Sequence, residues 1–325
     1  MVLLLATCIA ALAVLILGAE MLTRGAVTLA RLLGIPPIVV GLTIVALGTS
    51  APELAIGIDA AIKGQGDLAV ANIAGTNMVN ILLILGLSAA LRPLSLKSQT
   101  IRMDLPAMIV AAALLVALAL DGRLSRLDGA VLFAAGLLYT ILVLHAARSE
   151  SRKVRAAFQK EYPAPDSADR QGGSTLFSAV HLVTGIALVV VAADWLVFGA
   201  AGLARMWGVS DAFIGLTVIA IGTSAPELVT TVLSTLRGNR DVAIGNLLGS
   251  SIYNICIILG LTCLFPVGGG VVSPALTLWD LPLVLLVALV CLPVFWTGRQ
   301  VSRGEGVAFV GCYLAYLTAL LILRT

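Results

Sequence analysis

Apolar residues follow one another along the chain in long stretches, and short polar or charged clusters separate these stretches. An α-helix needs about 20 mostly apolar residues to cross the hydrocarbon core of a bilayer. The pattern predicts ten such helices, at residues 2–22, 36–62, 68–91, 104–120, 127–147, 175–203, 210–236, 242–265, 277–297 and 305–323. Backbone groups in lipid must be satisfied internally, and no regular in-and-out alternation is present. The expected fold is therefore an all-α polytopic membrane protein.

The composition supports a membrane protein and excludes several other classes. Of the 325 residues, 60% are hydrophobic and only 11% are charged, which is not the composition of a water-soluble globular domain. The net charge of +3 comes from basic residues scattered through short loops, so no nucleic-acid partner is expected. The five cysteines lack the CxxC spacing of metal or redox sites and are interpreted as packing residues. No cofactor and no protein partner are indicated.

Lysine and arginine are distributed unevenly between the two sets of connections. With the N-terminus outside, the first, third, fifth, seventh and ninth connections hold 15 of the 20 basic residues. Cytoplasmic loops collect Lys and Arg, so we expect a multi-pass protein of the cell (inner) membrane with both termini outside. The longest polar connection, residues 148–174, is rich in charge, glycine and proline and is expected to be a cytoplasmic linker.

The sequence contains an internal duplication. The run GTSAPEL occurs at residues 48–54 and again at residues 222–228, and the two halves align at a constant offset of 174 residues. GLTIVALGTSAPEL in the first half corresponds to GLTVIAIGTSAPEL in the second, and ANIAGTNMVNILLILGL corresponds to GNLLGSSIYNICIILGL. Glu20 and Asp194 also fall in register. Self-similarity at one fixed offset over such a length indicates a repeated structural unit.

The number of helices between equivalent points sets the relative orientation of the two copies. Five helix-to-helix steps separate Glu53 from Glu227, and an odd number makes the second copy enter the membrane from the opposite side. The chain is therefore predicted to form two inverted-topology five-helix repeats, at residues 1–147 and 175–325, joined by the linker. Inverted repeats with interrupted helices are typical of secondary transporters, whose substrate site lies near the bilayer midplane.

The duplicated motif places oxygen-bearing side chains around one glutamate in each repeat. Pro52 and Pro226 lack a backbone N–H, so each is expected to loosen its helix and free a carbonyl oxygen. Thr49 lies four residues before Glu53 and therefore on the same helix face. The same spacing recurs in the second copy, and the following helix adds hydroxyl and amide groups. The candidate ligands are Glu53, Glu227, Thr49, Thr223, Ser50, Ser224, Thr76, Asn80, Ser250 and Asn254.

The two glutamates determine which substrates this candidate site suits. An intramembrane carboxylate costs about 3 kcal/mol or more, and no basic residue lies near the middle of any predicted helix. Two carboxylates with neutral oxygens suit hard cations such as Ca²⁺, Na⁺ or Mg²⁺, and competition between cations or protons would couple their transport. A hydrolase with Ser50 or Ser224 as nucleophile lacks a base in either motif, so no enzyme is expected. A cation channel is another alternative, distinguished by a flux that needs no counter-ion.

The paired repeats, each joining GTSAPEL to a helix with glycine and asparagine, resemble the alpha-repeats of the cation/calcium exchanger family, and most closely its prokaryotic sodium/calcium exchangers. The resemblance covers residues 20–90 and 194–265 in detail. It implies a secondary active antiporter that exchanges sodium ions for calcium by alternating access, with the first and sixth helices sliding. It also implies that Glu53 and Glu227 bind both ions.

The same resemblance assigns neutral ligands to these ions. They are the side chains of Thr49, Thr223, Ser50, Ser224, Thr76, Ser250 and Asn80, and the backbone carbonyls of Ala46 and Ala220. Asn254 departs from the family pattern, because sodium/calcium members often carry an aspartate at this position. A proton-coupled antiporter of calcium or another divalent cation, from the same family, therefore stays the alternative.

Overall fold

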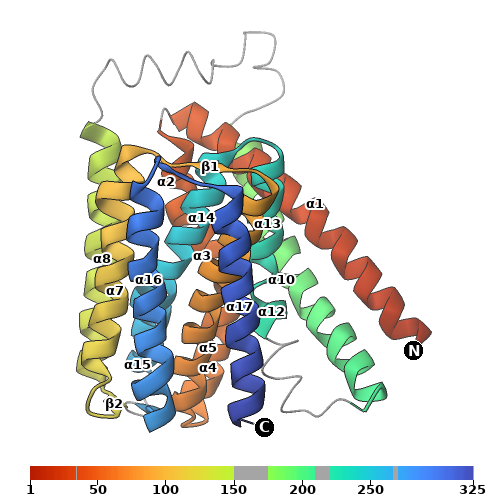
Figure 1. Cartoon of the computed structure of the whole chain (residues 1–325). Helices are drawn as coiled ribbons and strands as arrows, with labels where there is room; N and C mark the ends of the chain where they lie inside the picture. The colour runs from red at the N-terminus through yellow and green to blue at the C-terminus, as the bar shows by residue number, and fades with distance from the viewer. Residues whose placement is uncertain (34, 150–174, 209–219, 266–269, 325) are drawn as a thin grey trace.

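The computed structural model describes residues 1–33, 35–149, 175–208, 220–265 and 270–324, and nearly all of them are helical (Figure 1). The first half contains α1 (Val2–Leu33), α2 (Pro37–Val40), α3 (Ala46–Thr49), α4 (Ala51–Ile62), α5 (Gly66–Met78), α6 (Gly86–Leu91), α7 (Leu105–Leu118) and α8 (Arg126–Ser149). The second half contains α10 (Thr175–Met206), α12 (Ala220–Thr223), α13 (Ala225–Leu236), α14 (Arg240–Tyr253), α15 (Gly260–Leu264), α16 (Leu281–Trp296) and α17 (Arg303–Arg324).

Short π-helical segments and four very short strands complete the described chain. The π-helical segments are η1 (Gly41–Val45), η2 (Val79–Leu85), η3 (Thr100–Asp104), η6 (Asn254–Leu259) and η7 (Leu276–Asp280). The strands are β1 (Leu94–Ser95), β2 (Arg123–Leu124), β3 (Gly270–Val271) and β4 (Gln300–Val301). The prediction of an all-helical chain was wrong only for these strands, which are two residues long each and lie between helices.

The long helices agree with most of the predicted membrane segments. Seven helices in the described part of the chain are long and apolar enough to cross a bilayer: Val2–Ala30, Gly66–Leu91, Thr100–Leu118, Arg126–Ala146, Leu176–Met206, Arg240–Leu264 and Leu276–Trp296. A bent pair, Pro37–Thr49 with Ala51–Ile62, brings this number to eight. The helix expected at 210–236 begins outside the described residues, and the one expected at 305–323 lies within α17. The chain is a mostly helical polytopic membrane protein.

Two predicted helices differ from the structure in their extent. The first was expected to end at residue 22, but α1 continues to Leu33. Glu20 and Arg24 are four residues apart within α1 and form an ion pair, so these charges do not end the helix. The second was expected to be continuous over residues 36–62, but it breaks at Ser50 with a bend of 45°. Pro52 follows two residues later and cannot donate the hydrogen bond that a continuous helix needs.

The strands connect the two halves of the chain in a reciprocal way. β1 pairs with β4, and β2 pairs with β3, both antiparallel. In each half one strand precedes α7 or its counterpart α16, and the other follows it. The first strand of one half therefore pairs with the second strand of the other half. β1 and β2 lie at opposite ends of the molecule (Figure 1), so the equivalent strands β1 and β3 do so too.

Close contacts between glycines join the two halves in the same reciprocal pattern. α6 of the first half packs against α17 of the second, and α15 of the second packs against α8 of the first. A Cβ atom on Gly306 would lie 2.6 Å from the carbonyl oxygen of Gly86, and one on Gly129 would lie 2.8 Å from that of Gly260. No side chain fits at these distances, so glycine allows the helix backbones to touch.

α1 and α10 form a separate helix pair beside the main bundle. They pack along each other and share a hydrophobic cluster with α2, η1 and α13. The larger cluster fills the main bundle around η2, α7, α14, η6 and α16. In Figure 1 the pair lies against the bundle near β1 and leans away from it toward the N-terminus. The pair and the bundle are therefore in closest contact at one end.

Candidate cation-binding site

The duplicated GTSAPEL motif forms a helix break in each half. Ser50 has φ −83° and ψ 13°, and Ser224 has φ −83° and ψ 6°, so neither continues the helix before it. New helices begin at the next residue, which places Glu53 and Glu227 in the first turn of α4 and α13. The positive end of a helix dipole stabilises a nearby carboxylate, so each break supplies favourable electrostatics to its glutamate.

Both glutamates are fully buried at the meeting point of the two halves. Glu53 and Glu227 are each 0% exposed, and they are close enough to interact electrostatically. Neither forms an ion pair with a basic side chain among the described residues. Ser50 donates a hydrogen bond from Oγ to Oε1 of Glu227 over 3.1 Å. Both carboxylate oxygens of Glu53 and Oε2 of Glu227 have no hydrogen-bond partner within the described part of the chain.

Neutral oxygens from both halves surround these carboxylates. Thr49 donates from Oγ1 to Oδ1 of Asn246 over 3.2 Å, and Asn246 in turn donates from Nδ2 to Oγ1 of Thr231 over 3.0 Å. Ser250 faces the Glu227 carboxylate, although its hydroxyl forms no hydrogen bond within the described residues. These two hydrogen bonds link Thr49 on α3 to Thr231 on α13 through Asn246 on α14. They therefore hold the helix break of the first half in a fixed position relative to that of the second.

Backbone contact between α14 and the first half brings these groups together. A Cβ atom on Gly249 would lie 2.6 Å from the carbonyl oxygen of Leu42 and 2.8 Å from Cβ of Ala46. α14 therefore rests directly on η1 and α3. Ala46 begins α3, and its carbonyl oxygen accepts hydrogen bonds from Oγ1 of Thr49 at 3.3 Å and from the backbone N–H of Ser50 at 3.1 Å.

The other predicted ligands lie on the helices that follow each break. Asn80 belongs to η2, which packs against α13, and Asn254 begins η6, which packs against α4. Each π-helical segment that carries one of these asparagines therefore contacts the helix of the opposite half that carries the glutamate. π-Helical segments are frequent at functional sites, which agrees with their position here. The remaining predicted side-chain ligands are all buried: Thr49, Ser50, Thr76, Thr223, Ser224 and Ser250.

Both asparagines are fully buried with unsatisfied amide groups. Neither the oxygen nor the nitrogen of the Asn80 and Asn254 side chains has a hydrogen-bond partner within the described residues. Burying such a group without a partner is costly, so these amides fit a ligand-binding role better than a packing role. Ala220 is the first residue of α12 and occupies the position that Ala46 holds in α3.

Sequence reasoning missed a set of polar side chains on α13 and one on α14. Asn246 is not among the ligands proposed from the sequence, although it accepts a hydrogen bond from Thr49. The signal on α13 was also present, because hydroxyl residues follow Glu227 at helical spacing. These buried residues are Thr230, Thr231, Ser234 and Thr235.

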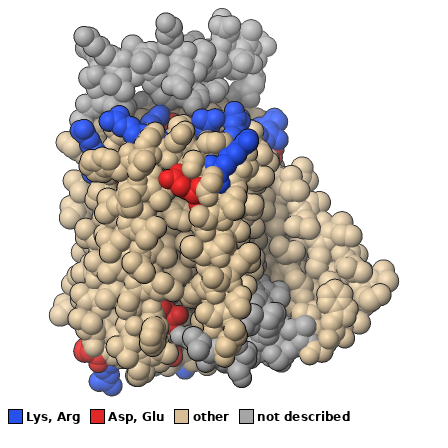
Figure 2. Space-filling model, in the orientation of Figure 1, with Lys and Arg blue, Asp and Glu red and all other residues tan. Residues whose placement is uncertain are grey.

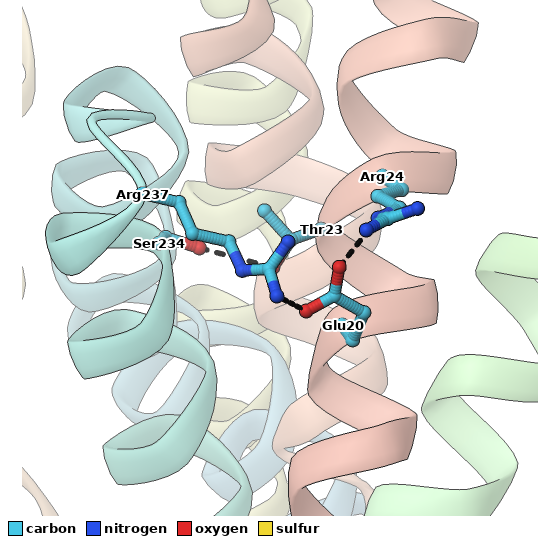
Figure 3. A network of polar contacts seen from close by, with 5 residues as sticks. All are labelled: Glu20, Thr23, Arg24, Ser234 and Arg237. Carbon is cyan, nitrogen blue, oxygen red and sulfur yellow. Dashed lines mark hydrogen bonds and ion pairs between the residues drawn. The ribbon is translucent and has the colours of Figure 1, made fainter.

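Two acidic residues outside the site have partners in the structure. Glu20, which is in register with Asp194, forms ion pairs with Arg24 and Arg237 (Figure 3). Asp59 forms an ion pair with Lys63, four residues later, and Nζ of Lys63 lies 2.7 Å from Oδ2 of Asp59.

The ligand types restrict the cation that the site suits. Within the described residues, no group of three or more His, Cys, Asp or Glu side chains is placed to hold a metal. The site instead combines two carboxylates with hydroxyl, amide and carbonyl oxygens, which are the ligands of hard cations. These features describe a polytopic membrane protein with a buried, oxygen-lined candidate cation site, to which two copies of one helix motif contribute.

The chain belongs to the sodium/calcium exchanger protein family, whose sequence model matches residues 3–145 and 177–322. It is 37% identical over 306 residues to inner membrane protein YrbG of Escherichia coli, which covers 93% of this chain and 92% of that protein. It is 30% identical to the sodium/calcium exchanger MaX1 of Methanosarcina acetivorans, over 94% of this chain and 95% of that protein. The resemblance inferred from the repeats is confirmed.

A solved structure of the sodium-calcium exchanger NCX_Mj, soaked with 10 mM Na⁺ and zero Ca²⁺, has the same fold. It is 25% identical, the TM-score is 0.82, and the match covers 98% of this chain and 100% of that one. The family consists of membrane transporters that exchange ions without a cofactor, and not of enzymes.

Proposed function

We propose that the protein is a secondary active antiporter that exchanges sodium ions for calcium across the cell membrane. The observation that carries this proposal is the pair of buried carboxylates, Glu53 and Glu227, which face neutral oxygens rather than basic side chains. Membership of the sodium/calcium exchanger family supports it, as do relatives that are named for sodium and calcium exchange.

Competition for one site would couple the two fluxes. Two carboxylates offset the charge of one Ca²⁺, and hydroxyl, amide and carbonyl oxygens complete the six to eight ligands that this ion prefers. Sodium ions bound to the same carboxylates would exclude calcium. The residues that we propose for these sites are Glu53, Glu227, Thr49, Thr223, Ser50, Ser224, Thr76, Ser250, Asn80, Asn254 and the carbonyls of Ala46 and Ala220.

We further propose ten membrane helices in two inverted repeats, at residues 1–147 and 175–325. The reciprocal pairing of β1 with β4 and of β2 with β3 supports inversion, because equivalent strands then lie at opposite ends. The reciprocal contacts of α6 with α17 and of α15 with α8 support it as well. Two equivalent halves can exchange conformations, which provides alternating access.

The distribution of charge supports an orientation in the membrane. Figure 2 shows Lys and Arg gathered at the end that carries β1, whereas both termini lie toward the other end in Figure 1. Cytoplasmic surfaces of membrane proteins are enriched in Lys and Arg. We therefore assign this basic end to the cytoplasm and both termini to the outside. The proposed cytoplasmic linker, residues 148–174, lies almost entirely outside the described residues.

The test measures uptake of radioactive calcium into proteoliposomes. Their internal solution contains sodium, contains potassium, or is more acidic than the outside. Uptake driven only by outward sodium, and lost in Glu53→Gln and Glu227→Gln, is the expected result. Asp59→Asn serves as a matched control, because Asp59 is an exposed acid on the same helix as Glu53. Uptake driven by protons alone would instead identify the proton-coupled antiporter. Unchanged uptake in both glutamine variants would contradict the proposed site.

A further inference from the structure

α13 carries a ladder of buried hydroxyl groups that continues from Glu227. Its members, defined here as the hydroxyl ladder, are Thr230, Thr231, Ser234 and Thr235, and each is 0% exposed. They follow the glutamate by three, four, seven and eight residues. Residues at these spacings share one face of a helix, so the ladder runs along α13 from the cation site toward its C-terminal end.

The ladder hydroxyls differ from those of Thr43, Thr262 and Ser251, which lie on other helices. Thr43, Thr262 and Ser251 each donate to the carbonyl four residues earlier in their own helix, over 2.7, 2.8 and 2.9 Å. This is the usual way for a membrane helix to satisfy a hydroxyl group. No ladder hydroxyl has such a bond among the described residues. The backbone of α13 therefore does not satisfy the ladder hydroxyls.

The partners of the ladder lie on neighbouring helices or are missing. Thr231 accepts a hydrogen bond from Asn246, and Ser234 shares one of 3.1 Å with Thr23 on α1. The hydroxyls of Thr230 and Thr235 have no partner within the described residues. Buried polar groups without partners are rare in native proteins, and inside a membrane they indicate a functional path.

The corresponding helix of the first half has no such ladder. At the constant offset of 174 residues, the four positions are occupied by Ile56, Gly57, Ala60 and Ala61 in α4. The fold itself therefore does not require hydroxyl groups at these positions. α4 and α13 begin with the same APEL sequence after the same kind of helix break. They differ only in the residues that follow each glutamate.

The ladder ends at an ion pair that joins α13 to α1. Arg237 follows the last residue of α13, and its guanidinium pairs with Glu20, which also pairs with Arg24 (Figure 3). The Glu20 side chain is only 18% exposed. Arg92 donates to the carbonyl of Leu236 over 3.4 Å, which places this ion pair beside the basic residues that precede β1.

We propose that the hydroxyl ladder is the path by which sodium and calcium ions move between Glu227 and the basic end, and that the Glu20–Arg237 ion pair closes this path in the structure. This inference rests on the proposed antiport function and deepens it. Hydroxyl oxygens replace part of the hydration shell of a cation that leaves the carboxylates. Movement of α1 away from α13 would separate Glu20 from Arg237 and leave it paired only with Arg24 on its own helix.

The opposite end lacks an equivalent closed ion pair. The register counterparts of Glu20 and Arg237 are Asp194 and Lys63. Lys63 pairs with Asp59 on its own helix, and Asp194 forms no ion pair within the described residues. The contact of Thr23 with Ser234 corresponds to apolar residues at that end. Among the described residues, the register counterparts of Glu20–Arg237 and of Thr23–Ser234 therefore form no polar contact with each other.

Cysteine modification tests the path without requiring exchange. In a full-length background with the five native cysteines replaced, Ser234→Cys would be treated with a membrane-impermeant cationic methanethiosulfonate reagent from each side of the vesicle. We expect modification from the basic side only, slowed by added calcium. Ala60→Cys, at the register counterpart, is the matched control and should not react from the basic side. Modification of Ser234→Cys only from the opposite side would overturn the path.

Removing the ion pair tests the gate. Glu20→Gln should speed modification of Ser234→Cys from the basic side by about two- to fivefold, the effect of losing one partly exposed ion pair. The exchanged pair Glu20→Arg with Arg237→Glu should restore the slow rate. No reaction from either side, in the Ser234→Cys protein and in its Glu20→Gln variant, would overturn the proposal. So would equal rates in all of these variants.

Measurements of calcium transport distinguish an error in the proposed ion path from an error in the proposed antiport function. Thr230→Val with Thr235→Val removes two hydroxyls while keeping side-chain shape, and should slow calcium release or uptake at the basic side. Thr262→Val is the control, because its buried hydroxyl bonds to its own helix. Wild-type protein without sodium-driven calcium uptake would contradict the antiporter. Normal uptake in the double variant would contradict the ladder alone.

Discussion

α4 and α13 begin alike and then diverge, and the divergence shows what a duplicated motif does and does not fix. Both start after a serine break with APEL, and both bury their glutamate completely. Beyond that turn, α4 buries only Gly57 and Ala60, whereas α13 buries the whole hydroxyl ladder. The shared residues place both glutamates at the candidate site between the halves. The unshared residues would make the two proposed routes to that site chemically different.

The helix caps and the glycine contacts are matched between the two halves, whereas the hydroxyl ladder is present only in the second half. Ser125 and Asp128 cap the start of α8 reciprocally, and Ser302 and Glu305 do the same for α17. The glycine contacts at α6 and α15 are likewise matched. In the proposed antiporter, the matched packing would permit two equivalent conformations, and the unmatched polar groups would distinguish the two sides of the membrane.

The largest expected effect tests whether the two equivalent glutamates contribute equally to transport. Glu53→Gln and Glu227→Gln should each reduce sodium-driven calcium uptake by about 100-fold or more, because each removes a charged ligand from one shared site. Uptake should be measured in proteoliposomes with equal amounts of folded protein, checked by size-exclusion chromatography. A variant that keeps more than a tenth of the activity would show that the two carboxylates are not equivalent.

The sequence was enough to propose the residues of the candidate site, but it predicted only part of the geometry around them. The offset that aligns Glu53 with Glu227 identified both acids, because an intramembrane carboxylate is rare and its duplication is informative. The break at Ser50 was only partly predicted: proline weakens a helix, but surrounding contacts decide whether it bends or breaks. Asn246 was missed as a ligand because its link to Thr49 spans 197 residues and depends on tertiary packing.

A second effect tests the matched glycine contacts. Gly306→Ala and Gly129→Ala should each lower the free energy of unfolding by about 1–3 kcal/mol, because the added methyl group forces two touching helix backbones apart. Gly304→Ala is the control, since a Cβ atom there meets no other atom within 4 Å. Thermal unfolding in detergent measures all three. A cost at only one of the two contacts would break the symmetry of the packing.

A third effect tests the asymmetry inside the site. Asn246→Ala should lower stability by about 1–2 kcal/mol, because it leaves Thr49 without its side-chain partner on α14 and removes the donor to Thr231. Asn72, its register counterpart, has a buried amide nitrogen without a partner in the described residues. Asn72→Ala should therefore cost less. Equal losses in a thermal unfolding series would show that the two asparagines play the same part.

The smallest expected effect compares the ion pairs at the two ends. The Asp59–Lys63 pair is 59% and 58% exposed, so Asp59→Asn should change the free energy of unfolding by about 0.5 kcal/mol or less. Glu20→Gln should cost up to about 1 kcal/mol, because the Glu20 side chain is only 18% exposed and joins two helices.

The salt dependence of the two mutational effects distinguishes these ion pairs better than the size of the effects at one salt concentration. Ions in solution screen exposed charges more effectively than partly buried ones. Raising the ionic strength from low to high should therefore abolish the effect of Asp59→Asn on thermal unfolding and leave most of the effect of Glu20→Gln. If both effects disappear together, the Glu20 pair is as solvated as its counterpart at the other end. The basic end would then have no stronger closure than the opposite one, and the contrast between the two routes would rest on the hydroxyl ladder alone.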